Sequence, residues 1–168
     1  MDADQYKLMN SLEENHWWFV SRRKIIDQVL AKFVSKGDVL EVGCGSGGNF
    51  SLLAKYGSID ASELNQEAIE NARNKNIANS IKCNSLPEEE PFEGKKYDLV
   101  AMFDVLEHID EDKKVIALLK NKLKDEGKLV LTVPAIKFLW SKHDEECHHK
   151  RRYNKKQFWI YCNLKAIR

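Results

Sequence analysis

Proline, glycine and cysteine are all scarce in this chain. Of its 168 residues 3 are proline and 8 are glycine, while 43% are hydrophobic and 32% are charged. This composition excludes collagen-like, low-complexity and disordered chains, and it predicts a folded globular protein. The four cysteines are widely spaced and form no CxxC pair. Their spacing excludes a zinc ribbon and a disulfide framework, and it indicates a reducing compartment such as the cytoplasm.

The chain also lacks an excess of either charge and any long apolar run. Its 27 basic and 26 acidic side chains leave a formal charge of +1, which gives no electrostatic reason to expect nucleic acid as a partner. No apolar stretch approaches the roughly 18 residues of a membrane span, and the acidic start Met1-Asp2-Ala3-Asp4 leads into no signal region. We therefore expect neither membrane insertion nor secretion.

Short apolar segments alternate with segments of helical periodicity. We expect strands at 38–43, 57–63, 80–84, 97–103 and 127–133, and helices at 4–15, 22–34, 50–54, 65–76 and 111–124. The last two strands are nearly continuous apolar runs, as expected when helices cover both faces of a parallel sheet. The pattern predicts one α/β domain over residues 1–168, with a doubly wound, Rossmann-like parallel sheet.

The chain divides into three regions within that domain. Residues 1–36 supply N-terminal helices and residues 37–135 supply the sheet. From residue 137 onward nine Lys or Arg residues accompany only three acidic ones, a net charge of +6 against −5 for the preceding residues. We therefore expect 136–168 to be a separate basic segment on the substrate side of the domain.

A glycine-rich loop follows the first expected strand. Its sequence, Gly43-Cys44-Gly45-Ser46-Gly47-Gly48, satisfies the GxGxxG pattern of dinucleotide-binding proteins. Glu41, two residues before the first glycine, would oppose the pyrophosphate of a nicotinamide cofactor, so the loop favours a ligand that is cationic and lacks phosphate. S-adenosylmethionine (SAM) fits this chemistry. Glu63 lies 20 residues after Gly43, where an acid would bind ribose hydroxyls in either cofactor.

Four motifs resemble, in order, those of class I SAM-dependent methyltransferases: VLEVGCGSGGN, ASELNQEAIENAR, FDVLEHIDED and GKLVLTVPA. They span about residues 37–135. The flanking segments EENHWWFVSRRKII and VPAIKFLWSKHDEECHHKRRYNKKQF resemble a bacterial subgroup with HWWF-x-x-RR and HD…H-x-RRY runs. The resemblance implies methyl transfer from SAM to a small-molecule or glycan-like acceptor.

The resemblance also implies roles for individual residues of the cofactor site. Glu41, Gly43, Gly45 and Gly47 would hold the methionine half of SAM, and Glu63 its ribose. The adenine would be flanked by Leu64 and recognised at Asn84 and Ser85, which stand where the family usually has an Asp. Phe103 and Asp104 would contact the methionine ammonium.

His108 is the candidate general base, because it follows the fourth strand near the edge of the sheet where ligands bind. The alternative is a structural histidine that orients its neighbours. The predicted substrate-binding residues lie in the basic segment: His143, Asp144, His148, Arg151, Arg152 and Tyr153. The two arginines suit an anionic group on the acceptor, although they could equally be solvated surface charges. The spacing of the histidines matches no recognised zinc pattern, so we expect no metal.

The run His16-Trp17-Trp18-Phe19 has two interpretations, an aromatic lid over the cofactor and a hydrophobic anchor packed in the core. Adjacent residues cannot share one helical face, so at least one ring is expected to meet a cleft.

Class I methyltransferases usually complete a seven-stranded sheet, but only about 33 residues follow Ala135. We therefore expect five parallel strands in the order 3-2-1-4-5, without the final antiparallel pair. The fifth strand would then be an exposed edge that favours a homo-oligomer or docking of the tail. Two other functions stay open: SAM binding with little turnover, and an NAD-dependent oxidoreductase.

Overall fold

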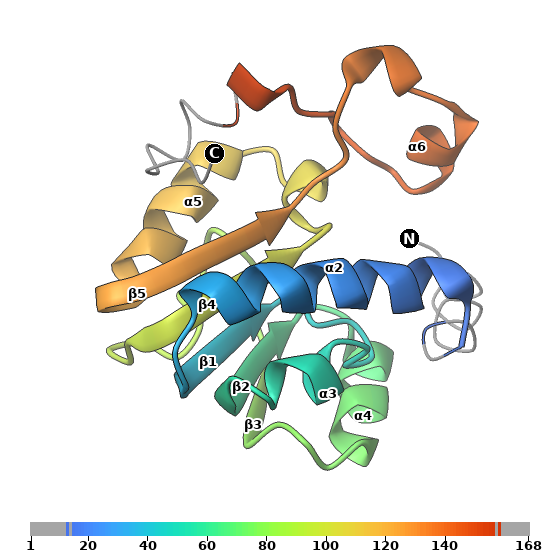
Figure 1. Ribbon diagram of the computed structural model, residues 1–168. Coiled ribbons are helices and arrows are strands. Elements are labelled where there is room, and N and C mark those ends of the chain that lie inside the picture. The colour runs from blue at the N-terminus through green and yellow to red at the C-terminus, as the bar shows by residue number, and fades with distance from the viewer. Residues whose placement is uncertain (1–12, 14, 157, 159–168) are drawn as a thin grey trace.

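A computed structural model describes residues 13, 15–156 and 158 of the chain (Figure 1). Its sheet consists of β1 (Gly37–Val42), β2 (Gly57–Glu63), β3 (Ser80–Cys83), β4 (Tyr97–Phe103) and β5 (Leu123–Thr132). All neighbouring strands pair in parallel, in the order β3-β2-β1-β4-β5. The predicted fold class and strand order are therefore confirmed for the described part of the chain.

The helices are α2 (Trp17–Phe33), α3 (Phe50–Leu53), α4 (Gln66–Asn74), α5 (Asp112–Asn121) and α6 (Lys142–Glu146), with short 3-10 turns at Leu106–His108 and Lys137–Leu139. Figure 1 shows α2 lying across one face of the sheet, in front of β4. The helix expected at 4–15 falls almost wholly outside the described residues. The helix expected at 22–34 begins earlier, at Trp17, where His16 occupies the N-cap position.

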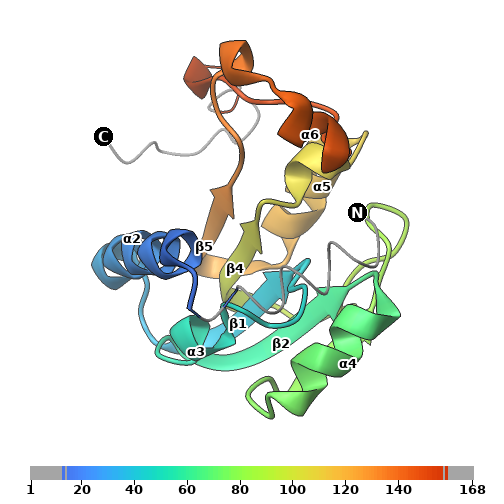
Figure 2. The ribbon, with the colours of Figure 1, turned by 90° about the vertical axis from the view of Figure 1, so that its right-hand side faces the viewer.

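Two apolar clusters hold these layers together, one on each face of the sheet (Figure 2). One cluster joins the sheet to α2, α3 and α4, and the other joins it to α5 and to Tyr153 of the basic segment. Of the apolar stripe expected on α2, Ile26 and Leu30 are buried, whereas Ile25 is 63% exposed. The apolar face of α2 is therefore wider than the part that the described core covers.

The helix expected to reach residue 124 ends at Asn121. The reason is that the chain joins the sheet early: the backbone N–H of Tyr97 donates to the carbonyl of Lys122, and Leu123 already pairs with Tyr97. The buried ammonium of Lys122 donates to Glu90 and to the carbonyl of Phe92, both at 2.6 Å. These two bonds satisfy the buried ammonium. A further helical turn would move Lys122 away from both partners.

The basic segment returns to the carboxyl edge of the sheet. Tyr153 forms a parallel bridge with Ala135, and its hydroxyl donates to Asp112 at 3.0 Å. Between these two points the chain carries α6 above the sheet (Figures 1 and 2). The described helices include none long and apolar enough to cross a bilayer.

Candidate active site

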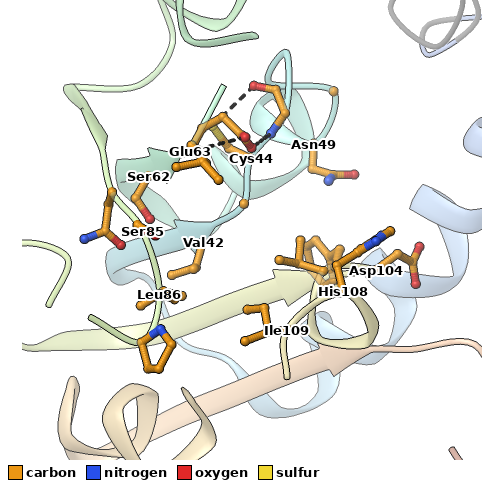
Figure 3. A pocket seen from close by; sticks show the side chains of 18 of the residues that line it. Val42, Cys44, Asn49, Ser62, Glu63, Ser85, Leu86, Asp104, His108 and Ile109 are labelled. Atoms are coloured by element: carbon orange, nitrogen blue, oxygen red, sulfur yellow. Dashed lines mark hydrogen bonds between the residues drawn. The ribbon is translucent and has the colours of Figure 1, made fainter. Parts of the chain in front are cut away.

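A cavity of about 840 Å³ opens at the carboxyl ends of β1, β2 and β4 (Figure 3). Residues of the glycine loop, of the loops after β2, β3 and β4, and of α2 line it. Among the predicted site residues the lining includes Gly43, Gly45, Glu63, Leu64, Asn84, Ser85, Phe103, Asp104 and His108. The structure thus brings most of the predicted cofactor residues, which lie far apart in the sequence, around one space.

The glycine loop follows a path that side chains would obstruct. Gly43 has φ +69°, and a Cβ on it would lie 2.4 Å from Val105. A Cβ on Gly45, also at positive φ, would meet nothing within 4 Å, so the space over this residue is open to a ligand. Positive φ in both residues favours glycine. Gly47, which was predicted to contact the ligand, does not line the cavity.

Glu63 lies at the end of β2 and holds two backbone segments at once (Figure 3). One carboxylate oxygen accepts the N–H of Gly45 at 2.9 Å. The other accepts the N–H groups of Leu64 and Asn65 at 2.9 and 3.0 Å. Glu63 therefore ties the glycine loop to the start of α4, and its carboxylate lines the cavity.

Glu41 lies behind the loop and does not line the cavity. It is buried, and one of its oxygens accepts a hydrogen bond of 2.8 Å from Asn49, which does line the cavity. Burial raises the pKa of this carboxyl to about 8. Glu41 thus positions Asn49. The sequence predicted direct contact between Glu41 and the ligand, but in the structure Glu41 does not face the cavity.

Arg22 on α2 is a cavity residue to which the sequence prediction gave no role. Its guanidinium forms an ion pair with Asp104 at 2.5 Å, donates to the Thr132 hydroxyl at 3.0 Å and lies over the Phe103 ring. The paired arginines of the HWWF-x-x-RR run were the signal that could have identified it. The Arg22 guanidinium and the Asp104 carboxylate therefore lie side by side at the ends of β4 and β5.

His108 lines the cavity opposite the glycine loop, in the 3-10 turn after β4 (Figure 3). Burial and the nearby His149 lower the pKa of His108 to about 4, so its ring is neutral at physiological pH. Its neighbour Glu107 is buried, and burial raises the pKa of that carboxyl to about 8.

None of the residues predicted for substrate binding lines the cavity: His143, Asp144, His148, Arg151, Arg152 and Tyr153. Arg152 binds the buried Asp144 with two nitrogens, at 2.7 and 2.8 Å. Arg151 forms an ion pair of 2.8 Å with Asp112. These contacts fold the basic segment on itself and onto α5. Lys150 of the same segment does reach the cavity.

The aromatic run divides between solvent and the cavity. Trp17 and Trp18 are 68% and 55% exposed, so of the two interpretations the hydrophobic anchor packed in the core is wrong for both. Phe19 lines the cavity beside the glycine loop. The first turn of α2 therefore presents one ring to the site and two to the surface.

A parallel sheet of this order, with a cavity where the strand order reverses between β1 and β4, defines a Rossmann-like α/β fold, in which ligands bind at that point of the sheet. Residues 15–165 match the model of a family described as methyltransferase domain. The chain belongs to this family, which confirms that it is a methyltransferase domain.

Individual relatives agree with that membership. The chain is 33% identical over 103 residues to a sarcosine/dimethylglycine N-methyltransferase of Aphanothece halophytica, and 31% identical over 113 residues to a ubiquinone biosynthesis O-methyltransferase of Rickettsia felis. The matches cover 57% and 64% of this chain but only 37% and 46% of those proteins. The chain thus aligns with less than half of the length of either relative.

Solved structures show the same fold. The plantazolicin methyltransferase BpumL, in complex with S-adenosylhomocysteine (SAH), is similar with a TM-score of 0.71 and 18% identity over 95% of this chain and 68% of its own. The magnesium protoporphyrin IX methyltransferase of Synechocystis PCC 6803, also with bound SAH, is similar with a TM-score of 0.64 and 18% identity. That match covers 85% of this chain and 72% of the other.

Proposed function

We propose that this chain binds SAM in the cavity and transfers its methyl group to a small-molecule acceptor. The observation that carries the proposal is the position of Glu63 beside the open space over Gly45. Glu63 accepts one backbone N–H on the oxygen nearest Gly45 and two on the other, so the oxygen nearest Gly45 can still accept a ribose hydroxyl. The bare backbone at Gly45 lets a ligand approach closely. Gly43 and Gly45 together shape the surface on which the methionine half would lie.

Asn84 supports the adenine end of this assignment. Its side-chain N–H donates to the carbonyl of Glu89, while its side-chain oxygen is buried without a hydrogen-bond partner among the described residues. An amino group such as that of adenine would satisfy this acceptor. Leu64 and Ser85 also line the cavity. The family's usual Asp is thus replaced by a residue that retains an available acceptor.

The ion pair of Arg22 and Asp104 supports the other end. The methionine part of SAM carries an ammonium and a carboxylate, and this pair offers one partner to each. More acidic than basic side chains line the cavity, the acids being Glu13, Glu63, Glu88, Asp104, Asp110 and Glu111. That excess favours a ligand with a sulfonium and an ammonium over the pyrophosphate of NAD.

SAM supplies an electrophilic methyl group, and its leaving group needs no proton. The chain's own contribution is therefore to align cofactor and acceptor and to exclude water, and alignment can be worth about 7–11 kcal/mol. His108 faces the cavity with a neutral ring that can accept a hydrogen bond from an acceptor hydroxyl or amine.

The acceptor would enter beside His108, Ile109 and Lys150, which line the cavity away from Asn84. Arg151 and Arg152 are held by carboxylates and do not line the cavity, whereas Lys150 does, so Lys150 is the better candidate for an anionic acceptor group. Its ammonium contacts Asp110, a pair that a carboxylate or phosphate could displace. A glycan-like acceptor and a homo-oligomer through β5 stay predictions.

Titration calorimetry with SAH and with NADH tests the cofactor. We expect SAH to bind and NADH not to compete; competitive binding of NADH would favour the oxidoreductase. Transfer of tritiated methyl from SAM to a panel of small amines, phenols and sugars tests turnover. SAH binding without transfer to any acceptor would favour the second candidate, a SAM-binding protein with little turnover.

A further inference from the structure

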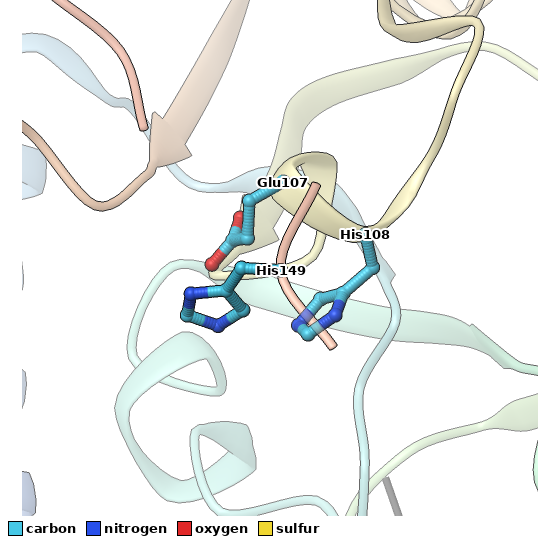
Figure 4. A group of neighbouring side chains, drawn as sticks. All are labelled: Glu107, His108 and His149. Carbon is cyan, nitrogen blue, oxygen red and sulfur yellow. The ribbon is translucent and has the colours of Figure 1, made fainter. Parts of the chain in front are cut away.

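Three side chains with metal-binding atoms meet beside the cavity, outside the cofactor contacts described above. Glu107 and His108 come from the turn after β4, and His149 comes from the basic segment. One carboxylate oxygen and one ring nitrogen from each histidine all lie within 4.8 Å of one another. Figure 4 shows the three side chains as neighbours, with the Glu107 carboxylate next to the His149 ring and the His108 ring on the other side of that ring.

The backbone holds the two segments together at this point. The N–H of Lys150 donates to the carbonyl of Glu107 at 2.9 Å, and the N–H of His149 donates to the carbonyl of Asp144 at 2.8 Å. His149 is therefore fixed opposite the turn that carries Glu107 and His108. The rings of the two histidines lie edge to face, with centroids 4.8 Å apart.

Each of the two histidine rings contacts a second group that orients it. Nδ1 of His149 lies 3.0 Å from a carboxylate oxygen of Asp144, which Arg152 holds in turn. The His108 ring contacts the backbone of His148. Metal-binding histidines commonly have one ring nitrogen bound by a carboxylate or a carbonyl, which orients the ring and leaves the other nitrogen for the ion.

Glu107 adds an independent observation. Its side chain is 1% exposed, and Oε2 has no hydrogen-bond partner among the described residues. A buried acceptor without a partner is costly, and an ion held by the two histidines would supply one.

We propose that Glu107, His108 and His149 bind a divalent transition-metal ion of the Zn²⁺, Co²⁺ or Mn²⁺ kind. Two imidazoles and one carboxylate suit these ions, whereas Mg²⁺ and Ca²⁺ prefer oxygen ligands. The ligand atom of His149 is Nε2, because Nδ1 contacts Asp144. Three protein ligands leave a coordination position open.

The site bears on the proposed methyl transfer, on which this part of the inference rests. Since His108 also lines the cavity, an oxygen or nitrogen of the acceptor could occupy the open position. A metal ion lowers the pKa of a group bound to it. His108 would then hold the ion, and an acceptor with an ionisable hydroxyl would need no separate base.

The test measures metal binding directly on the full chain after dialysis against a chelator. Zn²⁺ is titrated by calorimetry, and Co²⁺ is followed by its visible absorption, which reports nitrogen and oxygen ligands. We expect one equivalent to bind. Glu107→Gln and His149→Ala should each lower the affinity at least tenfold. Both residues lie outside the cavity lining, so SAH affinity should stay within about twofold of the wild type.

His143→Ala is the matched control, because His143 is an exposed histidine of the same segment and is not in the cluster. This variant should bind metal as the wild type does. No binding by the wild type, or a loss in His143→Ala equal to that in His149→Ala, would overturn the metal site. Such a result with SAH binding intact leaves the proposed function standing, whereas loss of SAH binding in the wild type contradicts that function separately. Circular dichroism of each variant excludes misfolding as the cause.

Discussion

Replacement of Glu63 by alanine should weaken SAH binding and loosen the glycine loop together. Its carboxylate accepts three backbone N–H groups, from Gly45, Leu64 and Asn65, and lines the cavity where a ribose would lie. A hydrogen bond to a charged group contributes about 1.5–3 kcal/mol. Loss of the ribose contact alone therefore predicts about 10- to 150-fold weaker binding.

The backbone contacts predict a second effect that does not need the ligand. Without the carboxylate, the N–H of Gly45 must turn to water, and the loop loses its tie to α4. We expect the free energy of unfolding to fall by about 1–3 kcal/mol, which for a chain of this size lowers the melting temperature by several degrees. Glu63→Gln should be intermediate in both properties, because its amide keeps one acceptor oxygen.

Calorimetric titration with SAH and thermal unfolding followed by circular dichroism measure the two effects. Glu67→Gln is the control: this exposed residue of the first turn of α4 lies four positions from Glu63 and does not line the cavity. It should change SAH affinity by less than twofold. Wild-type SAH affinity in a folded Glu63→Ala chain would refute the ribose assignment.

Three further changes test other contacts. Glu41 has a pKa raised to about 8 in the folded chain against an ordinary value near 4.5, so the folded state keeps a proton that the unfolded state has lost and stability falls as pH rises between those values. Between pH 5 and pH 8 the free energy of unfolding of Glu41→Gln, measured in urea, should rise by about 1–3 kcal/mol relative to that of the wild type. Parallel dependence of the two free energies on pH would contradict this. Arg22→Ala should weaken SAH binding about tenfold, whereas Arg22→Lys should retain part of the affinity; equal affinities in all three chains would exclude a contact with the methionine carboxylate. Arg152→Ala leaves Asp144 buried without its main partner and should cost about 3 kcal/mol or more in chemical unfolding, with no such loss on replacing the exposed Lys142.

The strands could be predicted from the sequence because each one is a short apolar run that can be recognised without knowledge of the rest of the fold. The strands at 57–63 and 97–103 were predicted with their observed bounds. The alternation of strands and helices predicted a parallel sheet, whereas the strand order was expected from the resemblance to class I methyltransferases. Glu41 shows where this reasoning stops. Alternation along a strand separates faces only when one face meets water, and β1 is buried on both, so the sequence did not tell whether Glu41 faces the ligand or lies behind the loop.

The basic segment was harder to interpret for a different reason. In the sequence, Arg151 and Arg152 resemble solvated or anion-binding surface residues. Their partners Asp112 and Asp144 come within reach only in the folded chain, where Tyr153 pairs with Ala135. Charged residues whose partners are brought close only by folding therefore cannot be recognised as paired from the sequence. The same closure brings His149 to Glu107 and His108, which no spacing rule along the chain could indicate.

The reversal of strand order between β1 and β4 has a consequence for how the protein folds. One wall of the cavity comes from residues 43–64 and the other from residues 103–111, and β4 pairs with β1 across about 60 residues of chain. Contacts of such long range form slowly, because the loop between them must close first. A bound cofactor would contact both walls and would stabilise only the state in which they have met, so it should slow unfolding far more than it speeds folding.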